Sequence, residues 1–218
     1  MLLYYFTSAH WGIDDLKNRW IKVSRFEDLN DPFEVFGADR SHRPHRAELR
    51  AFRDKTNKNN GLICFTRGWQ NPVTWGHYGD RHRGISLGFK ITSPRLVKVI
   101  YARTPLAVEI DPESSGLVLN AETKANLLRT KFREWKYERE RRLILPLGKC
   151  IKRGKLFFWQ FDRGLVLRHV VIGPQCPEKI GAVRKLLADF EPEVKVTKAR
   201  LAFRSFNVVE NKAATKAG

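Results

Sequence analysis

The sequence is short of cysteine and has no long apolar segment, and both absences exclude whole classes of protein. The three cysteines, Cys64, Cys150 and Cys176, are odd in number and far apart, so we expect neither a disulfide scaffold nor a tetrahedral zinc site. No apolar run approaches the roughly 18 residues that a membrane span requires. The first six residues have neither the basic segment nor the length of a signal peptide, so we expect a cytoplasmic protein without a membrane partner.

Acidic residues are also outnumbered, with 23 Asp and Glu against 41 Lys and Arg, which gives a formal net charge of +18. Such an excess attracts polyanions, and nucleic acid is the commonest of these in a cytoplasm. The basic residues cluster in residues 40–53 and again in residues 129–142. Within these clusters the candidate nucleic-acid-binding residues are Arg43, Arg46, Arg50, Arg139 and Arg141. The alternative is a generally basic protein with no such partner, because charge alone does not separate the two.

Short β-favouring segments alternate with helical patterns along the chain, which predicts a mixed α+β fold. The sheet is expected to be largely antiparallel, with helices at its periphery. Strands are predicted over residues 2–6, 62–66, 84–91, 165–172 and 201–209, and helices over residues 41–56, 120–134 and 177–190. The length suits a single domain over residues 1–209, followed by a polar tail, 210–218, that we expect to be disordered.

Two glutamates stand close together in residues 135–142, which read WKYERERR and precede the apolar run 143–145. If this segment is a strand, Glu138 and Glu140 project from the same face, and the flanking arginines keep both ionised. Such a pair suits catalysis, because one carboxylate stabilises a developing cation while the other handles a proton. The alternative is an exposed strand edge that carries alternating charges.

Three sequence boxes together resemble a bacterial family catalogued as domain of unknown function 2971. The match spans residues 2–173, and its boxes are residues 26–34 (FEDLNDPFE), residues 64–66, 75–78 and 84–89, and residues 135–141. This layout is also similar to the ADP-ribosyltransferase superfamily, whose split mixed sheet holds NAD in a central cleft. Many members of that superfamily carry the E-x-E pattern that Glu138 and Glu140 form here.

The resemblance implies roles for individual residues. Glu140 would hold the ribose of NAD and stabilise the oxocarbenium ion as nicotinamide leaves, and Glu138 would orient or deprotonate the acceptor. Contacts to NAD, as substrate, would come from Tyr4, Tyr5, Trp75, His77 and Tyr78. Tyr4 and Tyr5 stand where that superfamily usually has Arg or His, and His77 is alternatively a structural histidine.

Three functions follow from these observations. The first is NAD-dependent ADP-ribosyl transfer to nucleic acid or to a nucleic-acid-bound protein, which would suit a toxin or antiphage effector with a neutralising protein partner. The second is a metal-dependent nuclease built from Asp31, Glu34, Glu134 and Lys136. The third is a protein that binds nucleic acid without catalysis, through arginines and stacking aromatic side chains.

Overall fold

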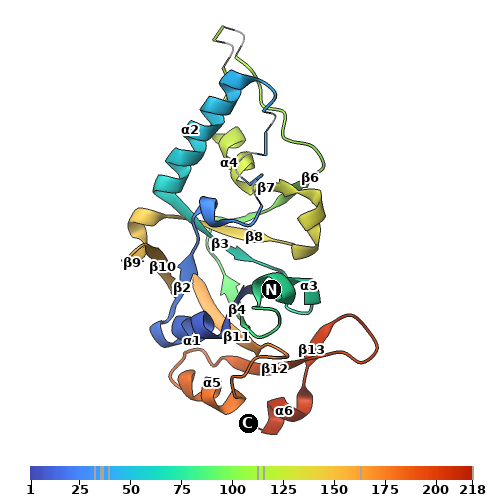
Figure 1. Cartoon of the computed structure of the whole chain (residues 1–218). Helices are drawn as coiled ribbons and strands as arrows, with labels where there is room; N and C mark the ends of the chain where they lie inside the picture. The colour runs from blue at the N-terminus through green and yellow to red at the C-terminus, as the bar shows by residue number, and fades with distance from the viewer. Residues whose placement is uncertain are drawn as a thin grey trace. The chain divides into compact units, whose positions relative to one another are not determined.

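The computed structural model describes residues 1–31, 33–34, 37–38, 40–111, 113–114, 116–162 and 164–217. It confirms the prediction of a mixed α+β protein with mostly antiparallel sheets (Figure 1). Where a single domain was predicted, the chain forms two compact units, made of residues 1–22, 64–94 and 158–218 (unit 1) and of residues 23–63 and 95–157 (unit 2). Among the described residues, no helix has the length and apolar character needed to cross a membrane.

Unit 1 is built on a five-stranded sheet in the order β1 (Leu3–Thr7), β4 (Ile85–Ile91), β11 (Leu165–Ile172), β12 (Lys195–Leu201) and β13 (Val208–Glu210). In this sheet β11 and β12 pair in parallel, and the other three pairs are antiparallel. Strand β4, which lies between β1 and β11, is buried on both faces from Ile85 to Phe89, so its apolar sequence is continuous instead of alternating.

One helix of unit 1 lies in the C-terminal segment that was predicted to be disordered. In the described part of the chain they are α1 (Ala9–Asn18), α3 (Pro72–Tyr78), α5 (Ile180–Leu186) and α6 (Lys212–Ala217). Ser8 caps α1 and Asn71 caps α3, as expected for short polar side chains at these positions. The tail predicted to be disordered contains α6, because Thr215 accepts hydrogen bonds from Arg184 and from the backbone N–H of Lys198.

Unit 2 contains helices and several short strands. The helices are α2 (Arg43–Asn59) and α4 (Ala121–Arg129), and the 3-10 turns are η1 (Phe26–Asp28), η2 (Arg133–Glu138) and η3 (Leu147–Lys149). Strands β3 (Asn60–Phe65), β8 (Arg141–Pro146) and β5 (Leu96–Lys98) form one sheet, and β6 (Ile100–Ala102) pairs in parallel with β7 (Thr130–Phe132). One more sheet, whose residues are divided between the two units, has the order β2 (Trp20–Val23), β10 (Leu156–Gln160), β9 (Ile151–Arg153).

Strand β7 overturns the prediction of one helix over residues 120–134. Helix α4 begins after the capping residue Asn120 but ends at Arg129. The next three residues pair with β6, which a pattern local to the chain cannot reveal. This early end places Lys131 inside unit 2 instead of on the surface of a helix.

Candidate functional site: a buried carboxylate cluster

The segment around the paired glutamates is not the strand that the sequence predicts. Glu138 is the last residue of η2, Arg139 adopts a left-handed conformation with φ of 50°, and β8 begins only at Arg141. A 3-10 turn followed by one left-handed residue reverses the chain locally. Glu138 and Glu140 are therefore brought together by a turn, and both are buried.

Lys131 lies between three carboxylates. Its Nζ is 2.7 Å from Glu138 Oε2, 3.2 Å from Glu34 Oε1 and 3.4 Å from Glu140 Oε2. The same ammonium group is 4.6 Å from the centre of the Trp135 ring, a cation–π contact. The side chain is buried, so these interactions form in a medium of low dielectric.

Arg142 is the second cation of the cluster and is 0% exposed. Its Nε donates to Glu140 Oε1 at 2.7 Å and its Nη2 donates to Glu140 Oε2 at 3.2 Å, a two-pronged contact. Nη2 also donates to Glu34, and Nη1 donates to the carbonyl oxygen of Leu128 at 2.9 Å. Because Arg142 links three segments of unit 2 that are distant in sequence, we expect it to stabilise their packing.

The carboxylate cluster, Glu34, Glu138, Glu140, Lys131 and Arg142, contains three acids and two cations. Burial raises the pKa of Glu34, while Arg142 and Lys131 act in the opposite direction. Tyr101 accepts a hydrogen bond from the Glu140 backbone N–H at 2.7 Å, and burial raises the pKa of its hydroxyl to about 12. The hydroxyl group therefore stays neutral and the carboxylates have strong donors around them.

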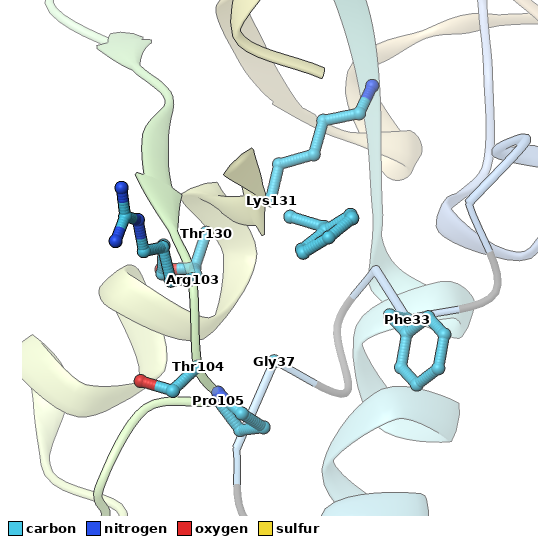
Figure 2. A pocket seen from close by; sticks show the side chains of 9 residues that line it. Phe33, Gly37, Arg103, Thr104, Pro105, Thr130 and Lys131 are labelled. Atoms are coloured by element: carbon cyan, nitrogen blue, oxygen red, sulfur yellow. The ribbon is translucent and has the colours of Figure 1, made fainter. Parts of the chain in front are cut away.

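A hollow of about 300 Å³ lies beside the cluster in unit 2. Figure 2 shows the ring of Phe33 on one side of it and Arg103, Thr104 and Pro105 on the other. Lys131 lines the hollow, but neither Glu138 nor Glu140 is among its lining residues. This volume is at the lower limit of the range for small-ligand sites.

The two tyrosines predicted to contact NAD lie on β1 in unit 1. The hydroxyl of Tyr4 is 3.1 Å from His169 Nδ1, and His169 Nε2 is 2.8 Å from Thr197 Oγ1. Burial, with Lys195 as a lesser cause, lowers the pKa of His169 to about 4, so the imidazole is neutral at pH 7. Tyr5 packs edge-on against Phe65. His169 was not predicted from the sequence, because no nearby motif marks it.

Of the other predicted NAD contacts, Trp75 is fully buried on α3. Its ring packs edge-on against Phe6, and its Nε1 donates to the carbonyl oxygen of Trp69 at 2.6 Å. These contacts make Trp75 a core residue of unit 1. His77 is exposed and Tyr78 is half-buried on the same helix.

The predicted nucleic-acid-binding arginines all belong to unit 2. Arg43 and Arg50 are exposed on α2, and Arg46 is half-buried on the same helix. Arg139 is exposed in the left-handed position between η2 and β8, and Arg141 is half-buried at the start of β8.

The nuclease hypothesis would use Glu34 as a metal ligand, but both of its carboxylate oxygens contact Lys131 or Arg142. In the described part of the chain, no group of His, Cys, Asp and Glu is arranged to hold a metal ion.

Comparison with known proteins found no matching family model, no matching curated protein and no matching solved structure.

Proposed function

We propose that this protein binds nucleic acid, and that helix α2 is one of its contact surfaces. The observation that carries the proposal is an arginine stripe, defined as Arg43, Arg46, Arg50 and Arg53. Their spacing of three, four and three residues aligns them along one side of the helix over about 15 Å. A row of guanidinium groups at this spacing suits the phosphates of a nucleic acid backbone.

The stripe and the buried side of α2 are separate faces. Leu49 is fully buried and belongs to a core cluster of unit 2, and His45 is buried on the same side of the helix. Arg43 and Arg50 are exposed, and Arg46 donates to the backbone carbonyls of Arg40 and Ser41 at the start of the helix. The two exposed arginines are therefore the strongest candidates for direct phosphate contact.

We therefore expect the affinity for nucleic acid to depend strongly on salt concentration. Each phosphate that a guanidinium group neutralises releases condensed counterions, so the logarithm of the association constant falls linearly with the logarithm of salt concentration. A surplus of 18 positive charges also accelerates encounter with a polyanion at low ionic strength.

The test compares wild type with the double variant Arg43→Gln/Arg50→Gln, using fluorescence anisotropy with a labelled mixed-sequence duplex over a salt series. We expect weaker binding and a salt slope reduced by about 2, one for each arginine that no longer neutralises a phosphate. The matched control is Lys17→Gln/Lys185→Gln, which removes two exposed cations from unit 1. Equal slopes for all three proteins, or no binding by wild type, would refute the proposal.

One observation favours a second candidate, NAD-dependent ADP-ribosyl transfer with nucleic acid as acceptor. Glu138 and Glu140, the pair on which the resemblance depends, converge on the same ammonium group. Lys131, which both glutamates contact, also lines the hollow of unit 2. Incubation with NAD and mixed oligonucleotides should release nicotinamide if the candidate is right, and Glu140→Gln should stop the release while the exposed Glu134→Gln should not.

A further inference from the structure

The loop between β12 and β13 exposes two large aromatic side chains. Phe203 is 89% exposed and Phe206 is 98% exposed, although burial of a phenylalanine side chain normally stabilises a fold. The loop is well defined at its base, where the Ala202 N–H donates to the carbonyl oxygen of Asn207 at 2.9 Å. Figure 1 shows it extending away from the sheet of unit 1. Paired apolar side chains held out in this way indicate a binding site.

Cations accompany the two rings. The guanidinium carbon of Arg200 lies 4.4 Å from the centre of the Phe203 ring, a cation–π contact. Arg204 is exposed and stands in sequence between the two phenylalanines. Alternation of aromatic and arginine side chains lets a surface stack on bases and neutralise phosphates at the same time.

The same loop forms a wall of a cleft of about 560 Å³, which is lined by residues 201–207 together with Pro72 and His82. Ser205, Asn207 and His82 place polar groups among its apolar walls, and His82 Nδ1 is buried without a hydrogen-bond partner among the described residues. A nucleobase has the shape and the edge donors and acceptors that such a lining would recognise.

The backbone next to His82 carries conformational strain. Asp80, Arg81 and His82 have φ values of 47°, 53° and 71°, a left-handed conformation that is unfavourable for a non-glycine residue. Hydrogen bonds from the His82 N–H to Trp75 and from the Gln175 N–H to the His82 carbonyl hold it in place. Strain that is maintained beside a cleft is typical of ligand sites, and His82, the last of these three residues, lines the cleft.

We infer that the aromatic loop, residues 202–207, binds single-stranded nucleic acid, with bases stacked on Phe203 and Phe206 and phosphates held by Arg204. The inference rests on the proposed nucleic acid binding and specifies the form of the ligand. Duplex bases are already stacked on one another and have no free faces, so this loop discriminates in favour of single strands. The polar groups of the cleft and the arginine between the rings favour this ligand over a lipid surface.

The test uses a labelled oligothymidylate of about 20 nucleotides, which exceeds the site size of one single-strand-binding module, and a duplex of the same length. The variant is Phe203→Ala/Phe206→Ala, whose side chains are exposed, so folding should be unaffected and is checked by circular dichroism. We expect at least about tenfold weaker binding of the single strand, because two base–aromatic stacks are lost, and unchanged binding of the duplex. Phe132→Ala, which removes an exposed ring from unit 2, is the matched control and should change neither.

The outcomes separate the inference from the proposed function. If the Phe203→Ala/Phe206→Ala variant keeps wild-type affinity for the single strand while the Arg43→Gln/Arg50→Gln variant loses it, the inference fails and the proposed function stands. If wild type binds neither oligonucleotide, both fail. Vesicles of mixed neutral and anionic phospholipid form the third arm, because phenylalanine-dependent binding to vesicles without phenylalanine-dependent binding to oligothymidylate would show a membrane anchor and overturn the inference.

Discussion

Replacement of Arg142 by Met should destabilise the protein far more than the same change at its neighbour. Arg142 is fully buried and donates to Glu34, Glu140 and the Leu128 carbonyl. Its removal therefore leaves buried carboxylates without this cationic partner in a medium of low dielectric. Breaking a buried ion pair from one side costs about 3–5 kcal/mol. Total stabilities of single domains lie near 5–15 kcal/mol, so we expect Arg142→Met to lose a large fraction of its free energy of unfolding.

The neighbouring residue is the matched control. Arg141 is half-buried and projects from the opposite face of β8, because successive side chains of a strand alternate. Arg141→Met should change the free energy of unfolding by no more than about 0.5 kcal/mol, as is usual away from buried networks. Urea unfolding followed by circular dichroism measures both variants, and hydrogen exchange of β7 and β8 locates the loss within unit 2.

A second substitution tests the physical cause. In Arg142→Met the stranded carboxylates should have raised pKa values, so the deficit should be largest at neutral and alkaline pH and should shrink as pH falls and they become protonated. Adding Glu34→Gln removes one stranded charge and should restore part of the loss. A deficit below about 1 kcal/mol, or one that neither low pH nor Glu34→Gln reduces, would refute the idea that this cluster is held by charge.

Two further predictions concern unit 1. Burial raises the pKa of Asp15 to about 8, with Asp14 acting in the same direction and Lys22 against it. The folded state therefore keeps a proton that the unfolded state releases near pH 4. As the pH rises from about 4 to 8, the free energy of unfolding should fall by up to about 1.4 kcal/mol per pH unit. Asp15→Asn should flatten this slope in urea titrations at several pH values. In thermal melts Gly84→Ala should cost at least about 1–3 kcal/mol, because the added methyl would overlap the Thr7 carbonyl oxygen and lie 2.8 Å from the Gly79 carbonyl oxygen. Gly181→Ala, in an open position of α5, should gain about 0.5–1 kcal/mol. A slope unchanged by Asp15→Asn, or equal melting temperatures for the two alanine variants, would contradict these expectations.

Most of the sheet of unit 1 is predictable from the chain because its strands are apolar and lie between clear turn signals. Strands β1, β4 and β11 all overlap their predicted ranges. Strand β7 is not predictable in this way, since Thr130–Phe132 directly follows a helix and is extended only because it pairs with β6. The E-x-E turn was missed for a related reason, because Arg139 adopts a left-handed conformation that local propensity does not favour for arginine.

What the sequence determined by itself is the amount and the local spacing of charge: a surplus of 18 positive charges and arginines that recur with the period of a helix in residues 43–53. Both properties survive folding, because a helix face follows from spacing alone. Only the tertiary structure decided which charged residues leave the solvent. Arg141 and Arg142 are adjacent and chemically identical, yet only Arg142 meets Glu34, 108 residues away, and a guanidinium group is buried only where such partners compensate its lost hydration.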